Sequence, residues 1–399
     1  MAPGRDRISQ LPADILDHIL GFLPIEDAAK TVVLSSIWRD VWLSLTQLNF
    51  DRRFFRYINN KHRRASNYVK KSAASLYVIN KVLRLHKGTI RKFVLCFYNV
   101  GKLAIRYRSY DIDEWLLLVT QKGVEEIYIG FAEQAYRLPG CIFSCLTLKR
   151  LHLYRVIVDP INFPCILPNV ASLCFQWVDF GPINCLDCAI DVPALENLSF
   201  IDCKDSFYFD ITAPKLCSLT IKSNSYNMLA KFLPVNLDLR SISTLDLNGF
   251  VQGFVKEFTR KGFRLNVKYL KLSRFEEFYT QSDRSSSLLA HVLRLCPKLR
   301  KLVINLFGLN SVATERMDAF LELHVVSQTN KKLHALKFIP FKGSHSETFF
   351  IKKLLASFST LEKVVIVRDK YHCKKDSTGI MQELLDLPFA STKTKIIIV

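Results

Sequence analysis

Two cysteines, spaced as Cys185-Leu-Asp-Cys188, form the pattern in this sequence that comes nearest to a metal or redox motif. A zinc ribbon needs a second such pair, and the next cysteines, Cys203 and Cys217, are single. The motifs HExxH, GxSxG, GxxxxGK and GxGxxG do not occur, so zinc-peptidase, hydrolase, phosphate-cradling and dinucleotide-binding chemistry find no support. We predict no catalytic residue, no metal site and no cofactor, and cysteines that pack as reduced thiols.

The length and composition predict a folded protein larger than one compact domain. With 399 residues, 49% of them hydrophobic, the chain is expected to form two domains or one elongated repeat. The first ten residues contain no apolar signal-peptide core, and no stretch approaches about 18 uninterrupted apolar residues. We therefore expect no signal peptide, no transmembrane helix, and a location in the nucleus, the cytoplasm or both.

The net charge of +20 is concentrated in one segment. Between Arg52 and Tyr110 there are 16 Lys or Arg residues and no Asp or Glu. Such a segment could attract phosphates, an acidic partner protein or nucleic acid. The alternative is a solvated surface beside a helical core, because Leu76, Ile79 and Leu83 recur at helical spacing and no nucleic-acid-binding motif accompanies the charge.

A pattern of the form L-x-x-L-x-L recurs along the middle of the chain. Its six clear copies begin 21 to 26 residues apart, within the ~20–29-residue period of leucine-rich repeats. These six copies begin at Leu148, Val170, Leu195, Leu216, Ile242 and Val267, and further copies begin at Ile90, Val124, Leu299, Leu333 and Leu361. The period predicts a solenoid; an ordinary α/β domain is the alternative, although its βαβ units usually need about 30 residues or more.

In each copy, the last two apolar residues are separated by one position, which places both side chains on one face of a β-strand. A single short strand is not stable alone, so neighbouring copies are expected to pair in parallel and to share one core. Covering helices are expected over residues 113–123 and 286–299. The predicted class is α/β, with a curved solenoid of parallel strands.

The strand positions between these apolar residues face the opposite, concave side of such a solenoid. Their side chains are chemically mixed and do not converge on a catalytic arrangement. They predict a broad surface for a protein or peptide partner, with the loops at the repeat edges or the C-terminal face as the alternative. The residues assigned to this surface are His152, Tyr154, Gln176, Lys222, Asp246, Asn248, Lys271, Ser273 and Asn305.

The N-terminal residues predict three short helices with more apolar surface than they can bury. Residues Ile15 to Leu23 supply an apolar band over nearly half of the first helix, which the following proline ends. A second helix is expected at about 26–34, and Ser35 or Ser36 should N-cap a third that carries two tryptophans. So small a unit cannot enclose these side chains. The solenoid is expected to cover one side of the band and a partner protein the other.

Residues 6–51 resemble the F-box of the large plant group of F-box proteins with leucine-rich repeats and a C-terminal FBD domain. The resemblance lies in Leu11-Pro12, Leu23-Pro24, Val33-Leu34-Ser35 and Trp38-Arg39 with Trp42. It implies that this motif docks on the SKP-type adaptor of a cullin-RING ubiquitin ligase. The adaptor-binding residues that it implies are Leu11, Pro12, Ile15, Leu16, Ile19, Leu20, Leu23, Pro24, Val33, Leu34, Trp38 and Trp42.

The sequence departs from the family pattern at two places. Ile25 stands where Thr or Ser usually follows the helix-ending proline, and Ser36-Ile37 stands in place of a basic pair. Ile25 cannot cap the second helix, a loss of about 1 kcal/mol unless Asp27 acts as the cap. The missing cations are expected to weaken any charge contact with an acidic adaptor surface.

The resemblance extends along the chain and implies four segments. Residues 1–50 are the F-box, 51–87 a basic helical linker that caps the solenoid, 88–330 the leucine-rich repeats, and 331–399 an FBD-type α/β cap. In this cap, Ile396-Ile397-Ile398 is expected to seal the last repeat. The function implied is the non-catalytic substrate-recognition subunit of an SCF-type E3 ubiquitin ligase, joined through its adaptor to a cullin and a RING subunit.

Two other functions stay open from the sequence alone. The chain could be a leucine-rich-repeat scaffold that does not assemble into a ligase, or a basic nucleic-acid-associated protein that uses the segment from Arg52 to Arg108. Some relatives with F-boxes and repeats hold small molecules or inositol phosphates. The sequence locates no pocket for such a ligand, so none is predicted.

Overall fold

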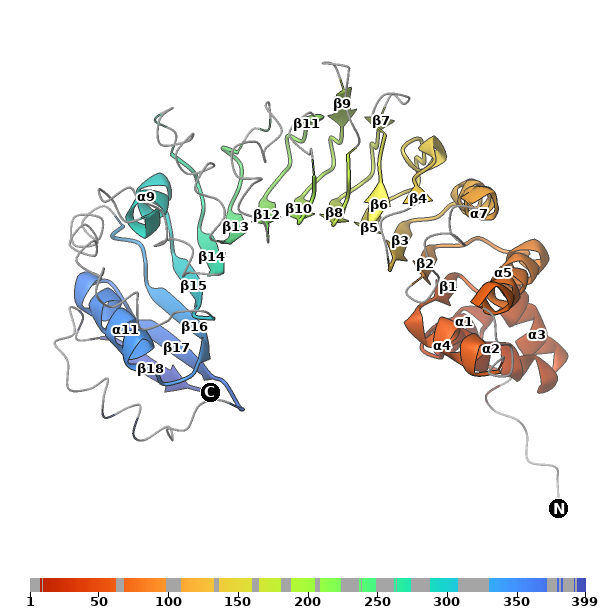
Figure 1. The fold of residues 1–399 in the computed structure, drawn as a ribbon, viewed down its shortest axis with the longest axis horizontal. Helices are drawn as coiled ribbons and strands as arrows, with labels where there is room; N and C mark the ends of the chain where they lie inside the picture. Colours follow the sequence, from red (N-terminus) through yellow and green to blue (C-terminus); the bar gives the residue numbers. More distant parts are fainter. Residues whose placement is uncertain are drawn as a thin grey trace. The chain divides into compact units, whose positions relative to one another are not determined.

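A computed structural model describes residues 8, 10–61, 68–97, 109–132, 136–159, 165–180, 188–204, 209–223, 237, 239–248, 262, 264–273, 288–307, 330–371, 379, 382, 391 and 393–399. The chain divides into two compact units, and Figure 1 labels their helices and strands. The first holds Met1–Leu195, Cys203–Ala213 and Pro234–Asn236, and the second holds Glu196–Asp202, Pro214–Leu233 and Leu237–Val399. Within the described ranges, every helix is too short or too polar to span a bilayer.

Three short helices open the first unit, as predicted. They are α1 (Ala13–Gly21), α2 (Ile25–Lys30) and α3 (Ser36–Leu43). The second helix ends earlier than expected, because its last turn tightens into a 3-10 turn, η1 (Thr31–Val33). Ser35 is the N-cap of α3, and its Oγ accepts a hydrogen bond from the backbone N of Trp38 at 3.5 Å.

The start of α2 differs from the expectation for Ile25 and Asp27. Pro24 occupies the N-cap position and makes no side-chain capping bond, while Ile25 is the first helical residue and is buried. Asp27 does not act as the cap, because its Oδ1 accepts a hydrogen bond from Lys30 Nζ at 2.7 Å. Apolar burial of Ile25 therefore takes the place of a polar cap at this position.

A short strand, β1 (Gln47–Phe50), ties these helices to the repeats. It pairs in parallel with β2 (Lys92–Phe97), so the sheet begins inside the segment that the sequence assigned to the F-box. Asp17 of α1 accepts hydrogen bonds from the backbone N of Thr46 at 2.8 Å and from its Oγ1 at 2.6 Å. The helix and the first strand are thereby held together.

The next segment, which follows β1, contains helices α4 (Arg52–Lys61) and α5 (Tyr68–Leu85) and ends at a buried histidine. His86 Nε2 lies 2.9 Å from the carbonyl O of Leu45, and its own carbonyl accepts a hydrogen bond from Lys122 Nζ at 2.9 Å. Burial lowers the pKa of His86; the bond to Leu45 opposes this shift and the nearby Lys122 charge adds to it. The ring is therefore held in its neutral form.

The sheet of the first unit continues through parallel strands in the order β1, β2, β3 (Glu126–Phe131), β5 (Arg150–Tyr154) and β8 (Ser172–Gln176). The register places Leu95, Ile129, Leu153 and Phe175 opposite one another, and all four are buried. Helix α7 (Ser109–Gln121) packs on this face, where the Trp115 and Phe97 rings stack with centroids 6.5 Å apart. The expected helix over 113–123 is thus present.

Short strands form two small sheets in the same unit. β4 (Tyr136–Arg137) pairs with β6 (Val156–Ile157), and β9 (Cys188–Asp191) lies between β7 (Cys165–Ile166) and β11 (Phe209–Thr212). All of these pairings are parallel. A 3-10 turn, η2 (Gly140–Ile142), follows β4.

The second unit is built from the same kind of repeat. Its parallel strands are β10 (Asn197–Ile201), β12 (Ser218–Lys222), β13 (Thr244–Asn248), β14 (Tyr269–Ser273), β15 (Lys301–Asn305), β16 (Ala335–Phe341), β17 (Lys363–Arg368) and β18 (Lys395–Ile398). One apolar ladder runs through paired residues from Phe200 on β10 to Ile398 on β18. Helices α9 (Leu288–Leu295) and α11 (His345–Ser357) belong to this unit, and α9 lies in the expected covering segment. The predicted strands and their parallel pairing are confirmed.

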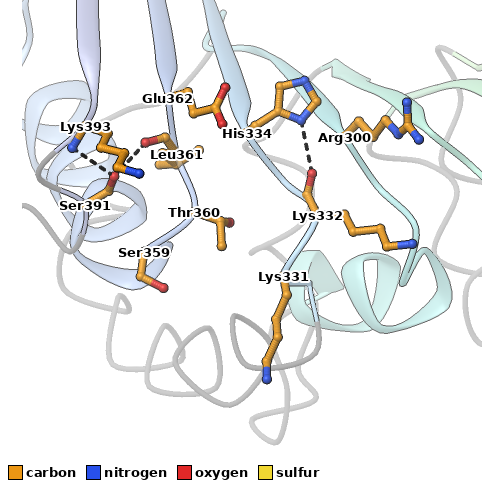
Figure 2. A pocket seen from close by; sticks show the side chains of 10 residues that line it. All are labelled: Arg300, Lys331, Lys332, His334, Ser359, Thr360, Leu361, Glu362, Ser391 and Lys393. Atoms are coloured by element: carbon orange, nitrogen blue, oxygen red, sulfur yellow. Dashed lines mark hydrogen bonds between the residues drawn. The ribbon is translucent and has the colours of Figure 1, made fainter.

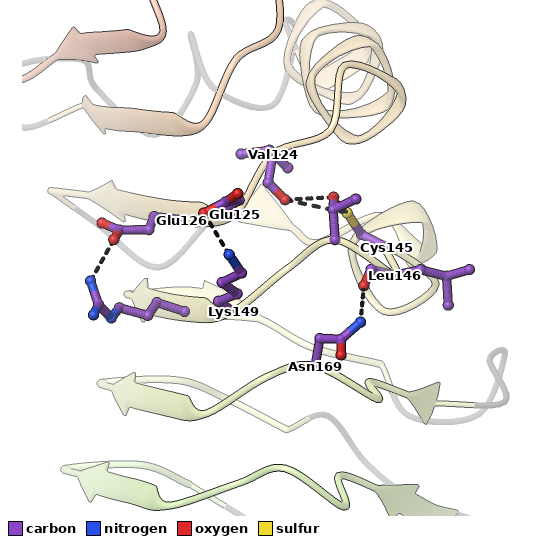
Figure 3. A network of polar contacts seen from close by, with 9 residues as sticks. Val124, Glu125, Glu126, Cys145, Leu146, Lys149 and Asn169 are labelled. Carbon is purple, nitrogen blue, oxygen red and sulfur yellow. Dashed lines mark hydrogen bonds and ion pairs between the residues drawn. The ribbon is translucent and has the colours of Figure 1, made fainter.

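The turns before the strands share one hydrogen-bond pattern. The carbonyl of Glu125 accepts from the backbone N of Lys149 at 2.7 Å and of Arg150 at 3.0 Å. Side chains add a second link between turns, for example Asn169 Nδ2, which donates to the Leu146 carbonyl at 2.7 Å (Figure 3). These bonds satisfy turn carbonyls that would otherwise lack a partner next to the core.

The N-terminal cap of helix α11 in the second unit can be tested by mutation. Ser344 Oγ accepts from Glu347 N at 3.2 Å, and Glu347 Oε2 accepts from Ser344 N at 3.0 Å, which is a reciprocal capping box. We expect Ser344→Ala to destabilise this helix by about 1 kcal/mol, and amide exchange in 345–357 to become about fivefold faster. Ser357→Ala is the matched control, because the half-buried Ser357 ends the helix, donates to the Lys353 carbonyl and caps no backbone N–H group. Equal exchange in both variants would contradict the capping role of Ser344.

Burial of His86 predicts how the thermal stability of the protein depends on pH. Its folded pKa lies below the ordinary value of about 6.5, so the unfolded chain binds more protons as the pH falls through that value. Stability contributed at this site is therefore present at pH 7.5 and is lost toward pH 5. We expect the fall in Tm over this range to be smaller in His86→Gln than in the unchanged protein. The exposed His18→Gln is the control, and the same pH dependence in all three proteins would refute the assignment.

Candidate functional site

The first helices leave one apolar surface uncovered. Ile15 and Ile19 on α1 are exposed, Ile15 by 43%, and Val33 on η1 is exposed by 86%. We call this surface the helical apolar face; its residues are Leu11, Ile15, Ile19, Leu23, Val33 and Leu34. The residues at positions 11, 15, 19 and 23 are spaced four apart, which aligns them along one side of α1 and its flanking turns.

Other predicted adaptor-binding residues support this face from inside. Leu16, Leu20 and Trp38 are buried within the unit, so their side chains are not available to a partner in this arrangement. Pro12 is exposed, whereas Pro24 and Trp42 are half-buried. The twelve predicted residues thus divide into a supporting layer and an outward surface, because a helix that packs against neighbours can bury only one of its sides.

Two exposed apolar residues of this region were missed at the sequence level. Phe22 is exposed at the end of α1, and Ile37 is exposed on α3 beside the exposed Ser36. Ile37 occupies one position of the basic pair that is usual in the family, so the departure exchanges a cation for apolar surface. Exposed apolar side chains that cluster on one domain often mark sites of protein association in folded proteins.

The open strand face, formed by the strand side chains that alternate with the core, carries the predicted partner-binding residues. In the first unit, a cavity of about 410 Å³ lies on this face, and its lining includes Tyr128, His152 and Cys174. The Tyr128 and His152 rings lie 4.3 Å apart, and Cys174 Sγ is 4.0 Å from His152 Nε2. The register places these side chains on adjacent strands β3, β5 and β8.

The chemistry of this cavity suits binding rather than catalysis. Burial lowers the pKa of His152 and raises the pKa of Cys174 to about 11. The imidazole is therefore neutral and the thiol protonated near pH 7, so this cysteine is not an activated nucleophile. The cavity offers a neutral, aromatic-lined floor beside the charged first residues of β2, β3 and β5, and a few polar groups on an apolar floor are typical of binding sites.

An aromatic and cationic cluster lies at the C-terminal ends of β5 and β8. The Arg155 guanidinium carbon lies 5.3 Å from the Tyr154 ring centroid and 5.4 Å from that of Trp177. Arg155 and Trp177 both adopt left-handed backbone conformations, with φ of 54° and 56°. Arg155 and Trp177 were not predicted, although each directly follows an assigned residue, Tyr154 or Gln176. Trp, Tyr and Arg are the residue types that dominate binding energy at protein interfaces.

On the second unit, several assigned residues of the open strand face already have partners. Asp246 Oδ2 lies 2.8 Å from Lys222 Nζ and 3.3 Å from Lys271 Nζ. Asn248 is buried, and its side chain accepts from the backbone N of Ser223 at 3.1 Å and donates to the Ser223 carbonyl. Asn248 therefore links two repeats and does not present a surface for a partner.

The remaining assigned residues are half-buried. Ser273 ends β14, and Asn305 ends β15, where its Oδ1 accepts from the backbone N of Phe307 at 2.9 Å. Among the described residues, no group of three or more His, Cys, Asp or Glu side chains could hold a metal ion. Cys185 lies outside the described residues, so the Cys185-Cys188 pattern is not placed by the structure.

Comparison with known proteins matches the N-terminal helices to one family. Residues 8–48 match the F-box domain, a range that contains α1, α2, α3 and the start of β1. The helical apolar face lies entirely within the matched range.

Several curated relatives align beyond the F-box. An F-box/FBD/LRR-repeat protein of Arabidopsis thaliana is 27% identical over 100% of this chain and 99% of its own length, and another is 22% identical over 98% and 96%. An F-box/LRR-repeat protein of the same plant is 31% identical over 55% of this chain and 40% of its own length.

Among solved structures, the leucine-rich repeat-containing protein LegL7 from Legionella pneumophila covers 80% of this chain and 94% of its own, at 11% identity and a TM-score of 0.35. The repeat assignment rests on the strand register of this chain and not on that likeness. The resemblance predicted from the sequence is confirmed: the chain carries an F-box domain and is similar, along its whole length, to the F-box/FBD/LRR-repeat proteins of plants.

Proposed function

We propose that this chain is the substrate-recognition subunit of an SCF-type E3 ubiquitin ligase. The observation that carries the proposal is the helical apolar face, which stays uncovered on a domain that matches the F-box. Its apolar side chains fit a helical partner such as the SKP-type adaptor. The adaptor would connect the chain to a cullin and a RING subunit, in the nucleus or the cytoplasm.

Burial of this face supplies the driving force in the proposed complex. Each Leu or Ile side chain that leaves water contributes about 1.5–3 kcal/mol before the costs of association. Leu16 and Leu20 fix the positions of the exposed residues on α1, because their own burial holds the helix in place. The interface therefore needs no rearrangement of the helices to form.

The repeats would hold the protein substrate, and the chain itself would perform no bond chemistry. Tethering raises the effective concentration of the substrate at the ubiquitin-charged enzyme, which accelerates transfer without a nucleophile on the receptor. The proposed substrate surface on the first unit is the cavity beside His152 together with Tyr154, Arg155 and Trp177. The assignment of residues 331–399 to an FBD domain remains a prediction.

Two alternatives are distinguished by binding. A scaffold without ligase assembly would show no adaptor binding, while a nucleic-acid-associated protein would bind duplex or single-stranded DNA strongly and with a steep salt dependence. Exposed basic residues on α4 and α5, such as Arg52, Lys81 and Arg84, would serve that second function. The receptor function requires only weak, sequence-independent DNA binding.

The adaptor interface is tested by Leu11→Asp combined with Ile15→Asp. Both side chains are exposed, so the fold should tolerate the change, whereas two carboxylates in an apolar interface should weaken adaptor binding at least about 100-fold. Co-purification and calorimetry with recombinant SKP-type adaptor measure the effect.

The matched control is Leu85→Asp combined with Leu117→Asp, two apolar side chains on α5 and α7 that are exposed by 52% and 48%. This control should bind the adaptor like the unchanged chain. Undiminished binding by the Leu11/Ile15 variant, or an equal loss in both variants, would reject the docking assignment.

The substrate surface is tested with the docking-deficient variant as bait. Targets captured by that variant in plant extract should not be degraded, and their affinity for the purified chain can then be measured. Trp177→Ala should weaken the binding of a true substrate about tenfold or more, since it removes an exposed aromatic anchor. The control is Leu146→Ala, because the Leu146 side chain is exposed at the opposite end of the strands. Unchanged affinity in Trp177→Ala would show that the substrate does not bind at this cluster.

A further inference from the structure

A second cavity lies at the N-terminal ends of the last strands, in the second unit. Its volume is about 720 Å³, and it is formed by the turns that precede β15, β16, β17 and β18 (Figure 2). Four cationic side chains line it, Arg300, Lys331, Lys332 and Lys393, against one carboxylate, Glu362. Among its described residues, cations therefore outnumber carboxylates, and none of these residues belongs to the proposed substrate or adaptor surfaces.

The corresponding turns of the first unit show how unusual this charge is. Arg300, His334 and Glu362 each directly precede a strand, as Glu125 and Lys149 do in the first unit. There, Lys149 Nζ pairs with Glu125 at 2.9 Å, and ion pairs also link Glu126 to Lys92 and Arg150. Among the described residues, none of the four cations of the second cavity has a carboxylate within 4.0 Å.

Several backbone and hydroxyl groups around this cavity already have partners within the protein. The backbone N–H groups of His334 and Ala335 donate to the Arg300 carbonyl, and those of Glu362 and Lys363 donate to the His334 carbonyl. The hydroxyls of Thr360 and Ser391 donate to the carbonyls of Leu333 and Leu361, each at 2.7 Å. The ammonium and guanidinium groups, together with the exposed hydroxyl of Ser359, are side-chain donors that line the cavity.

Donors of this kind bind phosphate oxygens through charge-assisted hydrogen bonds. Parallel strands lie about 4.8 Å apart, so the turns from β15 to β18 span roughly 14 Å. A single phosphate cannot neutralise cations spread over that distance. A ligand with several phosphate groups matches both the charge and the extent of the cavity.

We propose that this cavity binds a ligand that carries two or more phosphate groups. The ligand is either a small polyphosphorylated molecule or a protein segment with two phosphorylated side chains, since both present the same groups to the cavity. The inference is independent of the proposed ligase function, because it uses neither the helical apolar face nor the open strand face.

Calorimetry with the full chain at about 0.15 M salt tests the proposal, with three probes: inorganic phosphate, inorganic tripolyphosphate, and a Gly-Ser peptide with two phosphoserines. We expect saturable binding of tripolyphosphate or of the peptide, at least about tenfold tighter than that of single phosphate. The probe that binds more tightly identifies the source. Binding of neither polyphosphorylated probe, or binding no tighter than single phosphate, would overturn the proposal.

The site itself is tested by Lys332→Glu combined with Lys393→Glu. This variant should lose at least about tenfold in affinity for the tighter probe. The matched control, Lys81→Glu combined with Arg84→Glu on exposed positions of α5, makes the same change in net charge and should lose about twofold or less. Equal losses would show that binding follows overall charge and would refute the site. Adaptor binding and Tm, unchanged in both variants, would confirm that each remains folded.

Discussion

Parallel backbone pairing between neighbouring repeats is the constraint on which the rest of this structure depends. An isolated strand leaves its N–H and C=O groups without partners, so each repeat is stable only beside the next. The register aligns one apolar ladder in each unit, from Leu95 to Phe175 in the first and from Phe200 to Ile398 in the second. Because side chains alternate along a strand, fixing the ladder also fixes which residues face outward. The cavity beside His152 is a direct result of that alternation.

The N-terminal helices obey a different constraint, that of size. Three helices and a turn form a core that can enclose Leu16, Leu20 and Trp38. It is too small to enclose Ile15 and Ile19 as well. Exposure of the helical apolar face therefore follows from the dimensions of the domain. The buried residues that stabilise the fold also orient the exposed apolar residues on the same helix, which explains why both kinds occur together in one sequence pattern.

Periodicity made the strands, their parallel order and the three helices predictable, since spacing alone determines which side chains share a face. It could not reveal that Asn248 turns inward to Ser223, because that depends on a backbone group about one repeat away. Nor could it find Arg155 and Trp177, whose contact arises from left-handed residues at two separate strand ends. The basic cavity was missed for the same reason: Arg300 and Lys393 are far apart in sequence, and only strand stacking brings their turns together.

The link between Asp17 and Thr46 has a consequence for how the protein can be divided. Through it, the F-box helices also cap the end of the repeats, because α1 is bonded to the residue that precedes the outermost strand, β1. A shorter product that begins after α3 would retain β1 without its cover, and an uncovered strand edge is a template on which further copies can assemble. Loss of the F-box would thus produce a self-associating chain rather than a free-standing recognition module.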